Sequence, residues 1–282
     1  MEKASLRSKD LFPSIFSRHA AAYKQRIDGI MARGEARGRR RAVELLQLRP
    51  GMRVLDLACG PGTLSAPMAA AVAAQADGAG EVVGIDLAAG MIELAREAHI
   101  PNSRFEVMDI ERLDFADASF DAAACGHGLQ FAPDLPRALR EAHRVLRPGS
   151  RFAASVPVDG CTQRPWQVMD EVVDRWLPPA PTASDQDRTR RTVNDTLELQ
   201  AAILAAGFRE AGVEVIEEKV RWDSAEQLVS RCMSWWDLAA RLEGVSDERR
   251  QAFRDEAVAT PRREHPGEIE TFGRTHVAWA VA

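Results

Sequence analysis

The sequence predicts an α/β fold with a mostly parallel, seven-stranded sheet, helices on both faces of the sheet and a helical cap. Three observations predict it. Residues 54–57 are a short apolar run with a single acid, the pattern of a buried parallel strand. Further apolar segments alternate with helix-forming segments as far as residue 158. After that point the alternation is interrupted twice, which indicates inserted segments.

The first strand leads directly into a glycine loop. Gly60-Pro61-Gly62 turns the chain sharply, and the Ala-rich segment 63–76 favours helix. Because glycine has no Cβ, a ligand can lie directly against this backbone. The free N–H groups of the first helical turn suit an anionic group. Asp56, near the carboxyl end of the strand, is suited to hold a cation or a hydrogen-bond donor.

The loop has three interpretations. A dinucleotide-binding loop requires a third glycine where this chain has Ser65. A tight turn that binds nothing is the plainest alternative. The order acid, small residue, Cys, Gly, Pro, Gly resembles the first motif of class I S-adenosylmethionine-dependent methyltransferases. In that family the loop wraps the methionine and ribose part of the cofactor.

The next two strands carry acids near their ends. Segment 81–86 ends in Asp86, and a carboxylate that accepts two hydrogen bonds side by side suits ribose hydroxyls. Segment 104–110 contains Asp109, which resembles the family's acceptor for the adenine amino group, with Ile110 against the ring. Met91, at the start of the predicted helix 89–98, is expected under the purine.

Two further sequence motifs support the resemblance. Phe120-Asp121 precedes the fourth predicted strand (120–125), and Leu-Arg-Pro-Gly (146–149) precedes the fifth (151–156). The resemblance is close over residues 41–158 and loose over residues 197–216. Within the family, the sequence motifs are most similar to those of the ubiquinone/menaquinone-biosynthesis type. It implies a Rossmann-like sheet and S-adenosyl-L-methionine as cofactor. The expected cofactor-binding residues are Asp56, Ala58, Cys59, Gly60, Gly62, Thr63, Asp86, Leu87, Met91, Asp109, Ile110, Gly126 and Tyr23.

The remaining segments set the domain organisation. We expect helices over 41–48, 138–146, 166–177, 197–206, 225–242 and 247–259, a sixth strand over 213–222, and an antiparallel seventh over 276–281. The predicted units are an N-terminal helical lid segment (1–40), the cofactor-binding core (41–158), an inserted helical cap (159–193), the core continued (194–222), a second cap segment (223–265) and the final strand of the core (266–282).

The N-terminal segment carries an apolar stripe at three- and four-residue steps, which includes Phe16 and Tyr23. It fits either an amphipathic helix packed on the core, which is favoured, or a lid over the cofactor. A basic run lies between Arg33 and Arg41, and a solvated helix face is favoured there over a contact with an anionic substrate.

The inserted segments contain most of the tryptophan. Their side chains either pack the inserted helices or line a substrate cavity, and together they predict an apolar, aromatic cavity for a small cyclic or polyketide-like molecule. The expected substrate-binding residues are Phe16, Gln130, Phe131, Trp166, Trp235 and Trp236.

Methyl transfer demands little of the protein. A sulfonium is already a strong electrophile, so the enzyme mainly aligns the nucleophile and excludes water. An O- or N-nucleophile also needs a base. His127, just past the fourth strand, is the first candidate because imidazole titrates near neutral pH, and His19 and His276 follow. The alternative for His127 is a structural role, with a hydrogen bond to the backbone.

The net charge, the apolar stretches and the cysteine positions argue against several classes of protein. A net charge of −5 and a pI near 5.8 over 282 residues argue against nucleic-acid binding. No apolar stretch is long enough for a membrane span, and the N-terminus has no signal-peptide pattern. The four cysteines are scattered and predict neither disulfides nor a metal site. We expect a cytoplasmic protein; a homodimer is left open.

The predicted function is transfer of a methyl group from S-adenosylmethionine to a small, largely apolar acceptor of secondary-metabolite or quinone type, by O- or C-methylation. Two alternatives keep the cofactor: a non-methylating reaction such as cyclisation, hydroxylation or decarboxylation, and a cofactor-sensing binding protein. Appearance of S-adenosylhomocysteine separates them.

Overall fold

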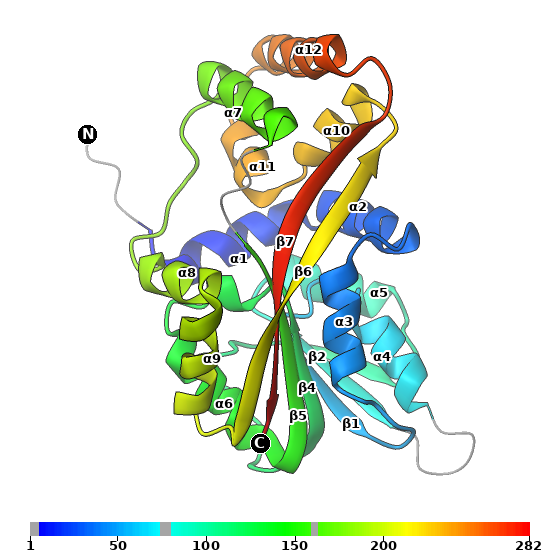
Figure 1. The fold of residues 1–282 in the computed structure, drawn as a ribbon, viewed down its shortest axis with the longest axis vertical. Helices are drawn as coiled ribbons and strands as arrows, with labels where there is room; N and C mark the ends of the chain where they lie inside the picture. The colour runs from blue at the N-terminus through cyan, green and yellow to red at the C-terminus, as the bar shows by residue number, and fades with distance from the viewer. Residues whose placement is uncertain (1–5, 74–79, 159–162) are drawn as a thin grey trace.

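A computed structural model describes residues 6–73, 80–158 and 163–282 of the chain. Its centre is one seven-stranded sheet in the order β3-β2-β1-β4-β5-β7-β6 (Figure 1). The strands are β1 (Arg53–Leu57), β2 (Glu81–Asp86), β3 (Ser103–Val107), β4 (Phe120–Gly126), β5 (Leu146–Pro157), β6 (Glu210–Trp222) and β7 (Ile269–Val281). Strand β7 runs antiparallel to both of its neighbours, β5 and β6, whereas the pairs from β3 to β5 are parallel. The predicted Rossmann-like sheet, with its antiparallel last strand, is confirmed.

The sheet is covered on both faces. The helices are α1 (Ser8–Arg18), α2 (Ala20–Ala32), α3 (Arg37–Leu45), α4 (Ser65–Val72), α5 (Ala89–Glu97), α6 (Leu135–Val145), α7 (Arg164–Trp176), α8 (Asp187–Asn194), α9 (Thr196–Ala205), α10 (Ala225–Cys232), α11 (Trp236–Leu242) and α12 (Asp247–Glu264), with a 3-10 turn, η1, at Leu129–Phe131. Helices α3 and α4 cover one face, and α6 and α9 cover the other (Figure 1).

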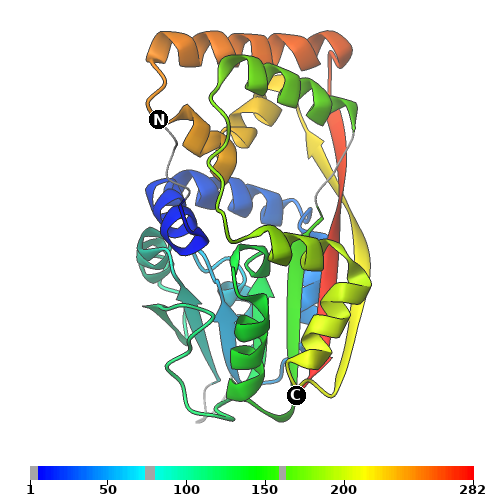
Figure 2. The same cartoon turned by 90° about the vertical axis from the view of Figure 1, so that its left-hand side faces the viewer.

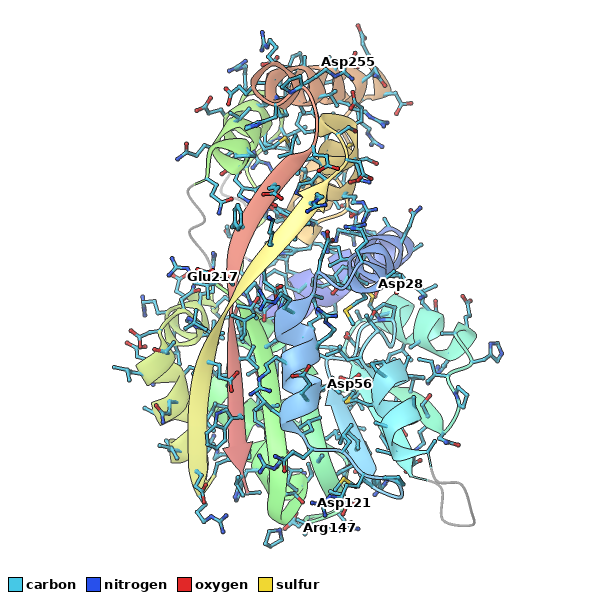
Figure 3. The ribbon with its side chains drawn as sticks, turned by 45° about the vertical axis from the view of Figure 1, so that its right-hand side comes forward. Asp28, Asp56, Asp121, Arg147, Glu217 and Asp255 are labelled. Carbon is cyan, nitrogen blue, oxygen red and sulfur yellow. The ribbon has the colours of Figure 1, made fainter. Side chains whose placement is uncertain are left out.

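The alternation of side chains along β1 divides the core between these two faces. Leu55 and Leu57 are fully buried in the cluster under α6 and α9. Val54 belongs to the cluster under α3 and α4. Asp56 therefore points to the same side as Val54, because neighbouring residues of a strand face opposite ways. Figure 3 shows Asp56 on β1, away from the end of the sheet where Asp121 and Arg147 begin their strands.

Strands β6 and β7 extend beyond the rest of the sheet. They pair along 13 positions, from Glu210 opposite Val281 to Trp222 opposite Ile269. Their far ends carry a cap of α7, α10, α11 and α12 (Figure 1). The cap has its own apolar core, in which Trp222 and Ile269 pack with Phe253. Figure 2 shows α1 and α2 between this cap and the sheet.

Two predicted helices differ from the structure, and a third helix of the structure was not predicted. The single helix expected over 225–242 is two helices, because Ser234 and Trp235 leave the helical path and Trp235 takes an extended conformation before α11. The helix expected from residue 41 begins at Arg37. Helix α8 is absent from the prediction because it is almost entirely polar, with only Thr189 and Val193 buried. Cys161 and the end of the helix expected over 63–76 lie outside the described residues.

Candidate active site

A cavity lies at the carboxyl ends of β1, β2 and β4, under α1 and α2. It encloses about 750 Å³ of space, part of it open to solvent. The predicted site residues that line it are Phe16, Tyr23, Ala58, Gly60, Asp86, Leu87, Met91, Asp109, Ile110, Gly126, His127 and Phe131. Residues far apart in the sequence thus meet where ligands of open α/β sheets bind.

Asp86 fixes the glycine loop. The Gly60 N–H donates to Asp86 Oδ2 at 2.9 Å, and the Ala88 N–H donates to Oδ1 at 2.8 Å. Gly60 has φ +56°, a conformation that favours glycine, and Ala58 shares it at +53°. Burial raises the pKa of Asp86, and the two N–H bonds oppose that rise. The carboxylate keeps lone pairs for further donors, as ribose hydroxyls would require.

A smaller cavity behind the loop is lined by Asp56, Cys59, Thr63 and Arg39. Ser65 Oγ donates to Asp56 Oδ2 at 2.6 Å, and burial raises the pKa of Asp56 to about 7. Asp56 Oδ1 and Thr63 Oγ1 are buried and have no partner in the described part of the chain. Buried polar atoms are normally hydrogen-bonded, so these atoms indicate a ligand group.

The smaller cavity fits the amino-acid end of S-adenosylmethionine. Asp56 and Thr63 would receive the ammonium group, and Arg39 would receive the carboxylate. Sequence reasoning treated Arg39 as part of a solvated basic run. Its neighbours do make surface contacts: Arg41 pairs with Glu214, and Arg33 pairs with Glu35. Arg39 differs because its Nη2 lies 3.4 Å from the Tyr23 hydroxyl, at the cavity wall.

Gly62 does not reach either cavity. It has φ +83°, and a Cβ placed on it would lie 2.9 Å from Ile100 Cδ1 and 3.4 Å from Phe105 Cζ. Its place is therefore against the side chains packed around α5, where it allows the loop to turn without displacing them.

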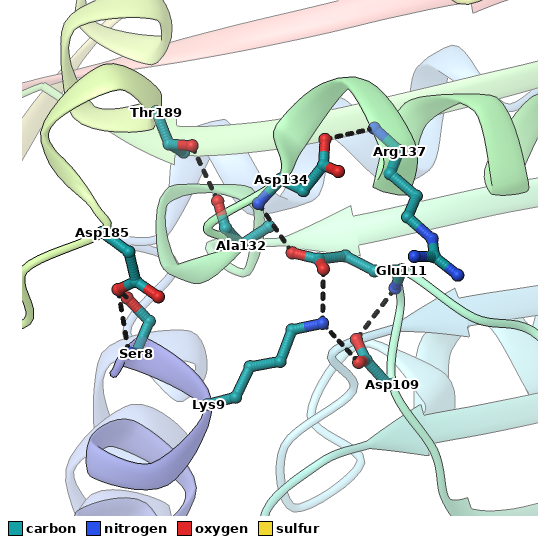
Figure 4. Close-up of polar contacts among 9 residues, drawn as sticks. All are labelled: Ser8, Lys9, Asp109, Glu111, Ala132, Asp134, Arg137, Asp185 and Thr189. Carbon is teal, nitrogen blue, oxygen red and sulfur yellow. Dashed lines mark hydrogen bonds and ion pairs between the residues drawn. The ribbon is translucent and has the colours of Figure 1, made fainter. Parts of the chain in front are cut away.

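The predicted adenine acceptor has an ion-pair partner. Lys9 Nζ lies 2.7 Å from Asp109 Oδ2 and also contacts Glu111 Oε2 (Figure 4). The Glu111 N–H donates to the other Asp109 oxygen at 2.9 Å. Glu111 Oε1 in turn accepts from the Asp134 N–H at 2.8 Å. Lys9 and Glu111 both line the main cavity, so α1 contributes a cation to the end of the cavity where Asp109 lies.

A second polar contact holds the start of α1. The Ser8 N–H and hydroxyl both donate to Asp185 Oδ1, at 3.0 and 2.7 Å (Figure 4). Sequence reasoning found none of Lys9, Glu111 and Asp185. Their partners are 100 to 177 residues away in the chain, and no local pattern signals such a contact.

His127 lines the main cavity in a constrained conformation. Its φ is +60°, uncommon for a residue other than glycine. Its N–H donates to the Ser155 carbonyl at 2.8 Å, and its carbonyl accepts from Gln130 Nε2 at 2.8 Å. Its Nε2 is buried without a partner in the described residues. Burial, then Arg39 and Arg26, hold the pKa of His127 well below its usual range, so the ring is neutral at physiological pH.

Five rings close the cavity; we call Phe12, Phe16, Tyr23, Phe131 and Trp236 the aromatic roof. Ring centroids are 4.9 Å apart for Phe12 and Phe131, 5.2 Å for Phe16 and Phe131, and 5.1 Å for Phe12 and Trp236. All except Trp236 line the cavity. The roof joins α1, α2, η1 and α11, so it connects the cap to the glycine loop, which Tyr23 approaches at Gly60.

Several predicted residues lie away from the cavity. Trp166 and Trp235 pack in the cap core, 5.0 Å apart. Gln130 holds the His127 carbonyl and is not part of the cavity wall. His19 bonds to Glu243 at 2.7 Å, and His276 bonds to the Val193 carbonyl at 2.9 Å. The contacts made by Gln130, His19 and His276 are structural.

Cys59, Cys125 and Cys232 are buried free thiols. No cluster of three or more His, Cys, Asp or Glu side chains that could hold a metal ion occurs in residues 6–73, 80–158 and 163–282. Within those same ranges, no helix has both the length and the apolar character needed to cross a bilayer.

Comparison with known proteins identifies related sequences. Residues 54–149 match the family described as "Methyltransferase domain". The chain is 32% identical over 224 residues to the 2-phytyl-1,4-naphtoquinone methyltransferase of Synechococcus elongatus, covering 73% of this chain and 92% of that protein. It is 30% identical to the demethylmenaquinone methyltransferase of Desulfitobacterium hafniense, over 58% of this chain and 66% of that protein.

The fold has solved counterparts. A SAM-dependent methyltransferase of Thermotoga maritima superposes with a TM-score of 0.52 at 17% identity, over 95% of this chain and 98% of that one. At this identity the similarity concerns the fold alone.

Proposed function

The chain belongs to the S-adenosylmethionine-dependent methyltransferase family, and on this premise we propose that it methylates a small quinone-type acceptor in the reduced, hydroquinone form. The observation that carries this proposal is the aromatic roof over the cofactor loop. Flat rings pack well against tilted and edge-on aromatic side chains, and four of the five roof residues line the cavity. The two relatives named above, whose printed names specify quinone substrates, support the same acceptor class.

The reduced form follows from the chemistry. S-adenosylmethionine, when bound, supplies an electrophilic methyl group on a sulfonium. Its partner must therefore be a nucleophile. A hydroquinone offers electron-rich oxygens and ring carbons, whereas the carbons of an oxidised quinone are themselves electrophilic. We therefore place a reduction of the quinone before the step that this chain performs.

The roles of the chain's own residues follow from their positions. We assign ribose binding to Asp86, adenine binding to Asp109, and binding of the methionine end to Asp56 and Arg39. Alignment and exclusion of water fall to the roof. His127 Nε2, neutral and without a partner, is in a position to take or hold a proton of the acceptor.

A turnover assay tests the proposal. The purified protein is incubated anaerobically with S-adenosylmethionine and a 2-prenyl-1,4-naphthohydroquinone, and S-adenosylhomocysteine and the methylated product are measured by mass spectrometry. The oxidised naphthoquinone is the matched control, and we expect it to be inert. Proton NMR of the product separates an aryl methyl group from a methoxy group. Absence of turnover across mono- and bicyclic hydroquinones would exclude this acceptor class.

A further inference from the structure

Lys9 on α1 bridges two carboxylates at the wall of the main cavity. Its Nζ lies 2.7 Å from Asp109 Oδ2 and also contacts Glu111 Oε2 (Figure 4). Glu111 is almost fully buried, and its other oxygen accepts the Asp134 N–H at 2.8 Å. Burial lowers the pKa of Lys9, but its bonds to the two acids raise the pKa by more, so the side chain is an ammonium. A buried carboxylate requires such a charge beside it.

Asp109 still has room for the adenine amino group. Its Oδ1 accepts the Glu111 N–H at 2.9 Å, and its Oδ2 accepts Lys9 Nζ. A carboxylate offers about four lone-pair sites, so each oxygen can accept a second donor. Lys9 therefore does not have to leave when adenine binds. The apolar stem of the lysine and the adenine ring would lie side by side at this end of the cavity.

The face of α1 that carries Lys9 also carries two rings of the aromatic roof. Lys9, Phe12 and Phe16 follow one another at steps of three and four residues, so they lie on one side of the helix. All three line the main cavity. Phe12 and Phe16 both pack against Phe131. One helical face thus extends from the expected adenine position to the expected acceptor position.

Two further polar contacts hold the ends of α1. Ser8 donates to Asp185 at the start of the helix. Arg18 pairs with Glu243 at its end, where the two side chains are 49% and 39% exposed. Exposed ion pairs contribute little to stability. The Lys9 bridge differs from this pair, because one of its carboxylates is buried and because it lies at the cavity wall.

We propose that Lys9 is a positioning residue that couples the binding of the two ligands. An adenine bound at Asp109 packs beside Lys9 and orders α1, and the two phenylalanine rings on the same helical face then hold the acceptor more tightly. This inference rests on the proposed function, because it concerns how that acceptor and the cofactor bind together. The first ligand meets the entropic cost of ordering the helix, so the second does not. Each ligand then raises the affinity for the other by the same factor.

Calorimetry measures this coupling without turnover. The full chain is titrated anaerobically with 2-methyl-1,4-naphthohydroquinone, alone and with saturating S-adenosylhomocysteine, which has no methyl group to transfer. We expect S-adenosylhomocysteine to raise the affinity of the wild-type protein for the hydroquinone by about fivefold or more. Lys9→Met should lose this increase, and Lys9→Arg should keep part of it because arginine retains the charge. Lys24→Met is the control, because Lys24 pairs with Asp28 on the surface of α2.

Three outcomes would overturn the proposal. One is an unchanged increase in Lys9→Met. Another is tighter binding of S-adenosylhomocysteine alone by Lys9→Met than by the wild type, because Lys9 would then compete with the adenine. The third needs only the wild-type protein, and it still decides if Lys9→Met does not fold. S-adenosylhomocysteine should slow the hydrogen exchange of the α1 amides, and unchanged exchange refutes the ordering of α1.

The exchange measurement also separates this inference from the proposed function, because it requires no acceptor. Failure of the hydroquinone to bind or to turn over would refute the acceptor class and leave the effect of S-adenosylhomocysteine on α1 to be read independently. Slowed exchange in the wild type and not in Lys9→Met supports the role of Lys9. Equal slowing in the two proteins refutes it.

Discussion

Asp86 combines an observed role at the residue scale, holding the glycine loop, with the ribose binding that we propose for it. Both of its oxygens already accept backbone N–H groups, from Gly60 and Ala88. The carboxylate thus shapes the glycine loop before any ligand arrives, and a ribose would add to bonds that already exist. Sequence reasoning identified the ligand role only, because the contact with Gly60 spans 26 residues of chain.

Asp86→Asn should therefore weaken both the loop and cofactor binding. One side-chain oxygen becomes an NH2 group that faces an N–H donor, so one of the two loop bonds is lost. We expect S-adenosylmethionine binding to weaken by about 1–3 kcal/mol, measured by calorimetry, with a lower melting temperature. Asp121→Asn is the matched control: Asp121 accepts the Arg53 N–H at 2.8 Å but lies at the other end of the sheet (Figure 3). Unchanged affinity in Asp86→Asn would remove Asp86 from the cofactor site.

His127 can be tested without disturbing the backbone. His127→Asn is preferable to His127→Ala, since asparagine tolerates the left-handed conformation at φ +60°. If the imidazole is the general base, the variant should lose about 10²–10⁴-fold in turnover with cofactor affinity nearly intact. Because burial lowers the pKa of His127, its ring is neutral well below pH 6.5. Turnover limited by this group should then begin to fall only at a pH below the usual histidine range. Near-normal turnover and an identical pH profile in the variant would identify His127 as structural.

The aromatic roof is the feature that matters at the scale of elements. It exists because α1, η1 and α11 meet, and α11 presents Trp236 there only because the chain breaks after α10. The same break directs Trp235 into the cap core against Trp166. Two adjacent tryptophans thus serve different parts of the molecule.

This difference gives a paired prediction. Trp236→Leu should raise the KM for the acceptor, because it removes a ring that packs against Phe12 and Phe131, and should lower the melting temperature only modestly. Trp166→Leu should do the reverse, since Trp166 contacts Trp222 and Trp235 within the cap. Each truncation of a packed ring should cost about 1–3 kcal/mol in the process it supports. Steady-state kinetics give the change in KM, and thermal melts give the change in melting temperature, for both variants. Equal effects of the two substitutions on KM would contradict a specific role for the roof.

At the scale of the whole molecule, the cap depends on the two longest strands. Helices α7, α10, α11 and α12 pack on the far ends of β6 and β7, with α1 and α2 between them and the sheet (Figure 2). Arg18 and His19, at the corner between α1 and α2, both bond to Glu243 after α11. The sheet, the N-terminal helices and the cap therefore enclose the site together.

Stability should depend on pH through a buried acid of this assembly. The pKa of Asp56 is raised to about 7 in the folded protein, so the folded state keeps a proton that the unfolded chain loses near pH 4. Its contribution is present below pH 4 and is lost as the pH rises through about 7. Relative to Asp56→Asn, which stays neutral and keeps an acceptor for Ser65, the wild-type protein should lose about 2–4 kcal/mol between pH 4 and pH 8. Denaturant unfolding of both proteins at several pH values measures this, and parallel curves would refute it. The opposite effect of His127 cancels in the comparison.

The sequence by itself determined the succession of the seven strands, the glycine loop and the acids at or near the carboxyl ends of β1, β2 and β3. These features are local: periodicity, turn residues and strand-end acids act over a few positions, and parallel strands bring their carboxyl ends to one edge. What only the tertiary structure decided depends on contacts between distant segments. Lys9 meets Asp109 across 100 residues, Trp236 and not Trp235 joins the roof, and Arg39 and not its neighbours faces a cavity. Such choices are made by packing, because the direction in which a side chain points is fixed only when its partner element is in place.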